Sequence, residues 1–258
     1  MEMIFNDRKD AGQKLAEKLA HYRQNPDAIA LGLPRGGVTV AHEIAQSLDL
    51  PLDILIVRKI GFPGNPELAA GAVSETGTVV INEKIVSGYG VSRAYLEKET
   101  TRQKEEIARR VALYRGGRGI PPLAGKTVIL VDDGVATGAT VKAAISTLKE
   151  EGIARLVVAI PVASQEAESE IGSMVDELIC LQAPGAFMAV GNYYYDFKQV
   201  DDDDVVAMLK CNLEESPGIP PLHNVRQNRR NAQWIEFDAL CPLALSRQPC
   251  VHTCHSHS

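Results

Sequence analysis

The sequence predicts an α/β fold with a doubly wound, mainly parallel sheet. Short and almost continuously apolar runs occupy residues 28–33, 127–131 and 155–162, and they alternate with stretches whose apolar residues recur at helical spacing. Strands of a parallel sheet are buried on both faces because helices cover both sides, so they lack the polar alternation of a half-exposed sheet. A Pro and two Gly residues follow the first run, which is typical of a tight strand-to-helix loop.

The first third of the chain opens with a helical stripe and continues through strands and helices. Apolar positions at Ala11, Leu15, Leu19 and Ala20 define the stripe. Farther on, Gly and Pro become dense, and two apolar runs then flank a Gly-bearing turn, which indicates a hairpin. In order, these patterns predict a helix over 7–22, a strand over 28–33, a helix over 38–48, a strand over 52–57, a loop over 58–73 and a hairpin over 72–81.

The rest of the body repeats the alternation. Charged residues fill a long helical stretch over 91–114, which we interpret as a solvated helix packed on one side. The short acidic run at 201–204 most simply caps the last helix, since carboxylates stabilise a helix N-terminus. The expected elements are the helix 91–114 with Leu96, Ile107, Val111 and Tyr114 inward, strands over 127–131, 155–162 and 175–181, a helix over 141–151 ended by Gly152, and a helix ending at Lys210.

Composition limits the classes of function. The chain has 258 residues, 45% of them hydrophobic, and a formal net charge of -6. An acidic protein is a poor match for the nucleic-acid backbone, which favours a basic surface. The charged, helix-periodic start does not resemble a signal peptide, and no stretch reaches the roughly 20 apolar residues of a membrane span. We therefore expect a cytoplasmic protein whose partners are small molecules, without nucleic acid or membrane, and leave a homodimer open.

Cysteine usage and composition divide the chain near residue 210. Only Cys180 precedes residue 211, whereas Cys211, Cys241, Cys250 and Cys254 crowd the end. Residues 211–258 have Pro, Gly and Asn without apolar periodicity, which predicts a linker and a disordered tail. Its Cys and His residues do not have the paired spacing of a zinc site. We expect a folded body over 1–210, and an aberrant reading frame remains an alternative origin of the tail.

The stretch "VILVDDGVATGAT", residues 128–140, carries the clearest chemistry. Its strand delivers Asp132 and Asp133 to the carboxyl end of the sheet, where ligands of open parallel sheets bind. Small residues and Thr hydroxyls then lead into a helix N-terminus, a combination suited to phosphate. Carboxylates beside a phosphate would repel it, so they must face sugar hydroxyls, a divalent metal or developing positive charge. The pattern therefore suggests a phosphorylated sugar.

Other motifs explain this stretch less well. A receiver domain also begins with acidic residues after a strand, but it has no use for a Gly/Thr loop there. A phosphate-binding loop of the Walker type needs a Lys, and a dinucleotide fingerprint needs three Gly residues at fixed spacing. A purely structural turn would leave the coincidence of acids, threonines and glycines unexplained.

Residues 128–140 resemble the signature of the type I phosphoribosyltransferases, and the order of elements agrees from about residue 3 to 205. The body looks most like a bacterial group of such proteins without an assigned acceptor. The resemblance implies that Asp132 and Asp133 hold the ribose 2- and 3-hydroxyls and act as the catalytic pair. It implies that the 5-phosphate binds the loop formed by Ala136, Thr137, Gly138, Ala139 and Thr140.

The resemblance extends to the pyrophosphate side of the site. "LPRGG", residues 33–37, resembles the family's pyrophosphate loop, which often contains an unusual cis peptide, so Arg35 and Gly36 are candidates. "VRK" resembles the family's basic pair at the next strand end, which implies that Arg58 and Lys59 meet the pyrophosphate. Residues 61–81 match the place of a mobile flap, expected as a loop over 61–71 followed by the hairpin.

The acceptor side is the least specified. The family uses a hood, here residues 183–200 with the N-terminal segment, and "FMAVGNYYYDF" faintly resembles the purine-type pattern. Phe187 would stack on a base and Asp196 would touch the metal, although aromatic residues here fit a core equally well. The spacing departs from the purine enzymes, and the lysine that reads a purine oxygen is missing.

The resemblance implies a magnesium-dependent transfer of the phosphoribosyl group from 5-phosphoribosyl 1-pyrophosphate to a nitrogenous base. Positioning and electrostatics would stabilise an oxocarbenium-like transition state, so no nucleophile is assigned. The alternative is a non-catalytic module that binds the same donor and regulates a partner. A receiver-like signalling domain is the third alternative, and it would be phosphorylated on Asp132 or Asp133.

Overall fold

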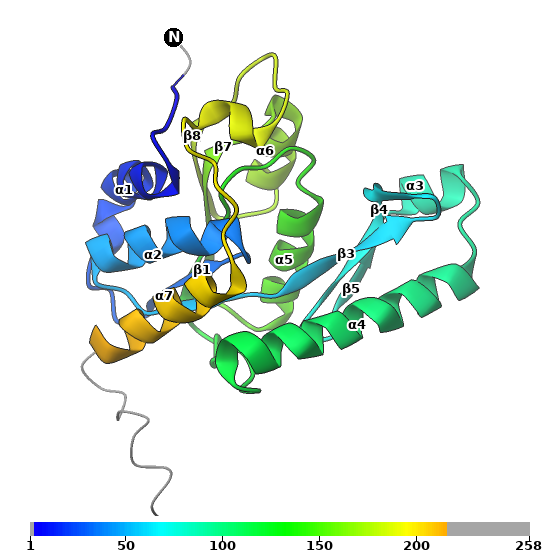
Figure 1. The fold of residues 1–258 in the computed structure, drawn as a ribbon, viewed down its shortest axis with the longest axis horizontal. Helices are drawn as coiled ribbons and strands as arrows, with labels where there is room; N and C mark the ends of the chain where they lie inside the picture. Colours follow the sequence, from blue (N-terminus) through cyan, green and yellow to red (C-terminus); the bar gives the residue numbers. More distant parts are fainter. Residues whose placement is uncertain (1–2, 216–258) are drawn as a thin grey trace, which may run out of the picture. The chain divides into compact units, whose positions relative to one another are not determined.

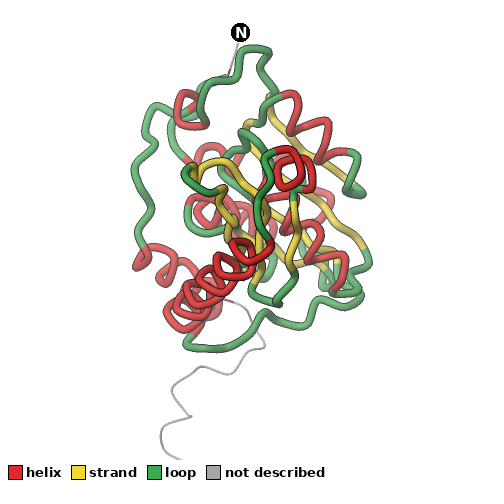
Figure 2. The backbone as a smooth tube through the Cα atoms, turned by 90° about the vertical axis from the view of Figure 1, so that its right-hand side faces the viewer, coloured by secondary structure: helices red, strands yellow, loops and turns green. Residues whose placement is uncertain are grey.

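The computed structural model describes residues 3–215, and its centre is a parallel sheet. The sheet has five strands in the order β2-β1-β6-β7-β8, and each neighbouring pair runs parallel. Helices lie on both faces of the strands (Figures 1 and 2), which confirms the predicted fold class. The strands are β1 (Ala28–Gly32), β2 (Leu52–Ile54), β6 (Thr127–Val131), β7 (Arg155–Val162) and β8 (Glu177–Gln182).

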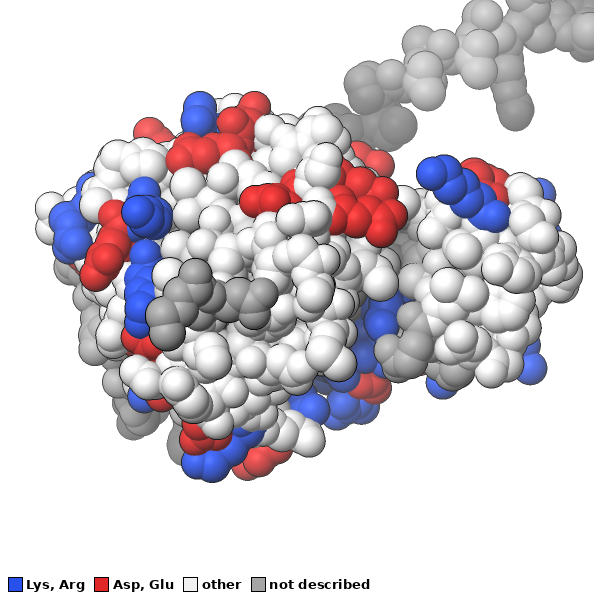
Figure 3. Space-filling view, turned by 90° about the horizontal axis from the view of Figure 1, so that it is seen from above, with Lys and Arg blue, Asp and Glu red and all other residues white. Residues whose placement is uncertain are grey.

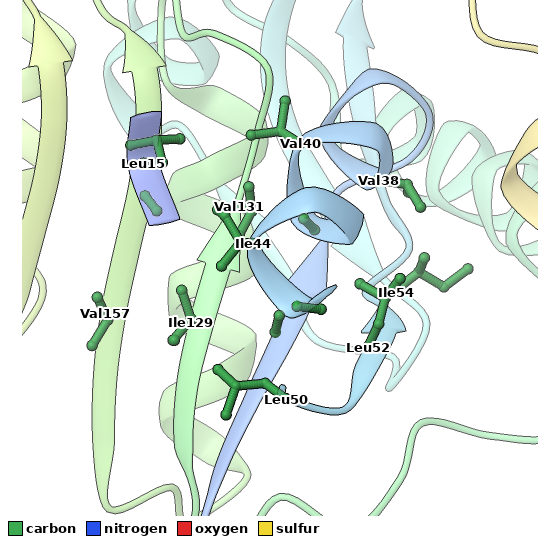
Figure 4. Packing of buried hydrophobic residues seen from close by; sticks show 14 of the residues in the cluster. Leu15, Val38, Val40, Ile44, Leu50, Leu52, Ile54, Ile129, Val131 and Val157 are labelled. Carbon is green, nitrogen blue, oxygen red and sulfur yellow. The ribbon is translucent and has the colours of Figure 1, made fainter. Parts of the chain in front are cut away.

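Two hydrophobic clusters fasten the helices to the sheet. One face packs against α1 (Arg8–Lys18), α2 (Gly36–Leu48) and α7 (Asp202–Glu215), and the other against α5 (Ala139–Glu150) and α6 (Gln165–Gly172). The central strands alternate between them: Ile129 and Val131 belong to the first cluster, and Val128 and Leu130 to the second. Figure 4 shows the first cluster from close by. A strand buried on both faces explains the continuous apolar run that predicted it.

A second, antiparallel sheet forms the region predicted as the flap. It comprises β3 (Val57–Phe62), β4 (Asn65–Ser74) and β5 (Val79–Ile81), followed by the short α3 (Glu83–Gly88). The predicted hairpin over 72–81 is confirmed as the β4–β5 pair. The loop predicted over 61–71 is wrong, because β3 and β4 pair through this stretch around a turn that contains Gly64 at φ 78°.

The predicted strand over 52–57 is also divided. β2 ends at Ile54, and the chain leaves the main sheet before β3 begins at Val57. Leu55 and Ile56 remain fully buried between the two strands. The run therefore stays apolar across the crossing, and apolarity alone does not reveal where one sheet ends.

The long α4 (Arg93–Arg115) returns from the second sheet and confirms the predicted helix. Ile107 and Tyr114 are buried on its inner side. At its end, Arg115 pairs with the buried carboxylate of Glu75 and lies 3.3 Å from Asp53. Glu75 also accepts a hydrogen bond from the Ile56 amide at 2.8 Å. This cluster joins the base of the second sheet to β2 and α4.

The last described helix, α7, runs past the predicted boundary at 210 to Glu215. Buried Asn212 accepts a hydrogen bond from the Leu52 amide at 2.8 Å and donates one to the Leu50 carbonyl at 3.3 Å. The expectations for the tail from residue 216 onward, including its cysteines, lie outside the described residues. Within residues 3–215, no helix has the length and apolar character that a membrane crossing requires.

We predict that Arg115→Met destabilises the protein by about 3–5 kcal/mol, because it leaves Glu75 and Asp53 with uncompensated buried charge. Urea denaturation measures the change. Arg93→Met on the same helix is the control, since the Arg93 side chain is 92% exposed and forms a surface pair with Glu97. Equal losses in the two variants would contradict the assigned role of the Arg115 cluster.

Candidate functional site

The candidate site begins where two neighbouring parallel strands end. β1 and β6 pair in register up to Gly32 and Val131, and the Leu33 amide extends the ladder by donating to the Val131 carbonyl at 2.9 Å. The loop over 33–37 and the acidic pair Asp132–Asp133 therefore leave the same edge of the sheet side by side. This is the edge at which open α/β sheets bind ligands.

Two glycines allow the loop to touch the acidic pair. A Cβ atom added at Gly36 would lie 1.8 Å from Asp133 Oδ2, and one added at Gly37 would lie 2.9 Å from the Asp132 Cα. Only a residue without a side chain permits this approach. The structure thus brings Gly36 against the acidic pair Asp132–Asp133, although Gly36 lies far from the pair in the sequence.

Asp133 is held by contacts on its carboxylate and its carbonyl. Arg8 Nε donates to Asp133 Oδ2 at 2.7 Å, and the Tyr194 hydroxyl donates to the Asp133 carbonyl at 2.6 Å. The Arg8 guanidinium also lies 3.9 Å from the centre of the Phe197 ring. The side chains of both Arg8 and Asp133 are largely buried. The Asp133 carboxylate is therefore fixed in place and its charge is compensated.

Asp132 has a different environment. Its Oδ1 accepts a hydrogen bond from the Asp133 amide at 2.9 Å. Burial, and next the neighbouring Asp133 carboxylate, raises the pKa of Asp132 well above its usual value of 3.8. Strongly perturbed acids such as Asp132 cluster at functional sites.

The loop after the acids leads into the N-terminus of α5. Gly138 is the N-cap with φ 72°, in the left-handed region that favours glycine, and no side chain of the described residues caps this helix start. The Ala136 carbonyl accepts a hydrogen bond from Ser164 Oγ at 2.7 Å. Thr137 is exposed, and Ala139 and Thr140 are half-buried at the helix start. Backbone N–H groups of this first turn can bind an anion.

Arg35 lies on the other strand-end loop. The Pro34–Arg35 peptide bond is cis, as the family resemblance leads one to expect at this loop. The Arg35 guanidinium is 3.9 Å from Asp202 Oδ1 at the start of α7. The Tyr114 hydroxyl donates to the same carboxylate oxygen at 2.5 Å, and burial together with this hydrogen bond raises the pKa of Tyr114 to about 12.

Arg58 and Lys59 lie on β3, where successive side chains point to opposite faces. Arg58 faces α4 and donates from Nε to Gln103 Oε1 at 3.0 Å. It lines a cavity of about 390 Å³ together with side chains of α4. Figure 3 shows a notch between the main body and the lobe of the second sheet, with Lys and Arg atoms inside it. Lys59 is directed to the other face of the strand.

The hood candidates are engaged in packing or ion pairing. The Phe187 ring stacks on Tyr193 at a centroid distance of 5.6 Å and packs against a small buried cluster. Asp196 Oδ2 pairs with Lys198 Nζ at 2.6 Å. The N-terminal segment joins the hood through a parallel bridge between Phe5 and Tyr194.

No cage for a metal is formed within residues 3–215, where groups of at least three suitably placed His, Cys, Asp or Glu side chains do not occur. Mg²⁺ is commonly bound through substrate phosphates, its own waters and few protein ligands. The carboxylate pair at 132–133 and the neighbouring helix start fit that mode, in which the substrate carries the ion.

Arg8 and Tyr194 are contacts of the acidic pair that the sequence did not predict. Arg8 lies at the start of a charged helix 125 residues before its partner Asp133. Tyr194 is one of several aromatics in the hood motif, and its hydroxyl is distinguished only by the fold. No local spacing in the sequence marks either residue.

The chain is similar to known proteins both in sequence and in structure. Residues 2–198 match the phosphoribosyl transferase domain. Two proteins from Mycobacterium tuberculosis strains CDC 1551 and H37Rv, each named "Putative phosphoribosyl transferase", are 44% identical over 206 residues, which is 80% of this chain and 46% of theirs. The chain thus spans about half the length of these relatives. The crystal structure of TT1426 from Thermus thermophilus is 46% identical, with a TM-score of 0.70 over 80% of this chain and 98% of that one.

We predict that Gly36→Ala destabilises the protein by about 1–3 kcal/mol, the usual cost of overpacking. The new methyl group would collide with Asp133 Oδ2, and this carboxylate cannot rotate away without leaving Arg8. Urea denaturation measures the effect. Gly119→Ala is the control, because nothing lies within 4 Å of a Cβ added there. A stability equal to that of the wild type would contradict the close approach of the loops.

We predict that Asp132→Asn raises the Tm at neutral pH. The folded pKa of Asp132 exceeds its unfolded value, so ionising this group opposes folding. The penalty is fully present above the raised pKa, shrinks as the pH falls toward 3.8 and is absent below it. Each kcal/mol relieved should raise the Tm by about 2–4 °C. Calorimetric melts at neutral and acidic pH measure this; Asp133→Asn, which removes the partner of Arg8, should give no increase.

Proposed function

Because the chain belongs to the phosphoribosyl transferase family, we propose that its site transfers a 5-phosphoribosyl group from 5-phosphoribosyl 1-pyrophosphate to a nitrogenous-base acceptor and releases pyrophosphate. One observation carries the proposal: the acidic pair, the glycine loop at 33–37 and the start of α5 share one sheet edge. These groups match the hydroxyls, pyrophosphate and 5-phosphate of one ligand.

The proposed roles divide along this edge. Asp132 and Asp133 accept hydrogen bonds from the ribose hydroxyls. The backbone of 136–140 and the first turn of α5 bind the 5-phosphate, since an uncapped helix start offers N–H groups and positive potential. The backbone at Gly36 and the Arg35 side chain face the pyrophosphate. Among the residues that the structure describes, the ion pair of Arg35 is a distant one, 3.9 Å from Asp202, so little binding energy opposes its turning to the substrate.

The second sheet supplies the remaining proposed parts. One of its basic residues, Lys59 or Arg58, approaches the leaving group. The two side chains point to opposite faces of β3, so they do not bind the pyrophosphate together from one side. The β3–β4 hairpin serves as the flap. Closing it over the site would exclude water from a reactive sugar cation, which water would otherwise hydrolyse.

Magnesium fits this scheme as an ion that arrives with the pyrophosphate. When bound, it supplies neutralisation of the leaving group's charge. The chain's own contribution is to hold the ribose hydroxyls by Asp132 and Asp133 and the phosphate by α5, so that the anomeric carbon is presented to the acceptor. Preorganised groups of this kind lower the barrier without a covalent intermediate.

The acceptor remains a nitrogenous base of unassigned identity. Phe187 is stacked on Tyr193, so a role as a base-stacking platform would require it to leave its present neighbour. Asp196 is ion-paired with Lys198 on the surface. Neither the Phe187 stacking nor the Asp196 ion pair supports a purine acceptor. The hood sequence also departs from the purine-type pattern, which disfavours a purine as well.

The test is to incubate the protein with phosphoribosyl pyrophosphate, magnesium and a panel of bases, and to follow pyrophosphate release. We expect release with one acceptor and its loss by at least a hundredfold, equivalent to about 2.7 kcal/mol, in Asp132→Asn with Asp133→Asn. Glu150→Gln with Glu151→Gln, an adjacent acidic pair at the far end of α5, is the matched control. Calorimetric binding of the donor without turnover on any base would favour the regulatory alternative, and absence of binding would overturn the proposal.

A further inference from the structure

Arg8 lies where three parts of the candidate site meet. Its side chain contacts the acidic pair through Asp133 and the hood through Lys198 and Phe197. A Cβ atom added at Gly36 would lie 2.9 Å from Arg8 Nε, so the strand-end loop is adjacent as well. Arg8 is only 9% exposed although it stands in the first turn of a helix on which the next residue, Lys9, is exposed.

The contacts require an arginine. Nε donates to Asp133 Oδ2 at 2.7 Å, whereas NH1 donates to the Lys198 carbonyl at 2.7 Å. The face of the guanidinium lies 3.9 Å from the centroid of the Phe197 ring. A planar fork can serve two acceptors and an aromatic face at once, but a lysine ammonium is a point donor on a flexible stem.

The hood has few other polar links to the acids. Its Tyr194 hydroxyl donates to the Asp133 carbonyl at 2.6 Å. The Phe5 amide donates to the Tyr193 carbonyl and the Tyr195 amide to the Phe5 carbonyl, each at 2.8 Å. The segment just before Arg8 and the hood are therefore joined by backbone hydrogen bonds, and Arg8 ties them to the carboxylate of Asp133.

We propose that Arg8 is a positioning residue: it holds the Asp133 carboxylate in place for the ribose hydroxyls and couples that carboxylate to the hood. This inference rests on the proposed function, because it assigns Asp133 to the ribose. It adds a residue from outside the strand-end motifs to the donor site. It also makes the geometry of the acceptor side depend on the same ion pair.

The test measures donor binding by titration calorimetry with phosphoribosyl pyrophosphate and magnesium. We expect Arg8→Gln to weaken binding by about tenfold or more, since hydrogen bonds to charged groups carry at least that factor. The donor affinity of Arg8→Lys should lie between those of the wild type and Arg8→Gln. A lysine keeps a positive charge beside Asp133 but cannot donate to both Asp133 and the Lys198 carbonyl. In the steady state, the KM for the donor should rise by a larger factor than kcat falls.

Two further variants separate positioning from folding. Lys9→Gln removes an exposed cation one residue away and should leave binding unchanged. Phe197→Leu keeps the Arg8 charge but removes the ring beneath it. It should also weaken donor binding, by a smaller factor than Arg8→Gln. Thermal melts confirm that each variant is folded. Equal donor affinity in wild type, Arg8→Gln and Phe197→Leu, or an equal loss in Lys9→Gln, would overturn this inference alone. Absence of binding by the wild type would overturn the proposed function and this inference with it.

Discussion

The parallel pairing of β1 with β6 is the constraint on which the candidate site depends. Their register ends at Gly32 and Val131, so two loops more than 90 residues apart leave the sheet at one level. The approach then requires glycine, because a side chain at Gly36 would occupy the space of Asp133 Oδ2. Close packing of both strands on both faces holds this register, since a slip by one residue would move each apolar side chain into the opposite cluster, which is packed around different side chains.

The site concentrates charge that the fold must tolerate before any ligand binds. Two acids stand side by side at a buried strand end, and among the described residues the Arg8 cation pairs with Asp133. Burial and the neighbouring Asp133 carboxylate raise the pKa of Asp132, so ionising Asp132 lowers the stability of the fold. The start of α5, by contrast, leaves N–H groups without a side-chain cap in the described residues. Stability is thus given up at both ends of the proposed ligand, as is common where a site is organised for binding.

Features formed by consecutive residues could be predicted from the sequence, whereas contacts that depend on how distant segments pack together could not. The acidic pair and the loop at 136–140 form one strand–loop–helix unit, so their joint position followed from the motif. The division of residues 52–57 between two sheets did not, because Leu55 and Ile56 stay buried throughout the crossing. Dense Gly and Pro over 61–71 suggested a loop, yet β3 and β4 pair through this stretch. Arg8 was invisible because its partner lies 125 residues away.

The contacts of the hood residues indicate a different role for this segment from the one that its sequence suggested. Phe187 was the candidate for stacking on a base, but its ring stacks on Tyr193. The Tyr194 hydroxyl donates to the Asp133 carbonyl, and the Phe197 ring lies under the Arg8 guanidinium. Two of these rings therefore lie next to the contacts of Asp133, and the Phe187–Tyr193 pair belongs to a small buried cluster. Among the apolar side chains described in this segment, Met188 and Tyr195 are the most exposed, at 81% and 76%. The stretch that resembles an acceptor motif therefore contacts the acidic pair, directly through the Tyr194 hydroxyl and indirectly through Phe197 and Arg8. Under the proposed function, these contacts would give it a supporting role on the donor side.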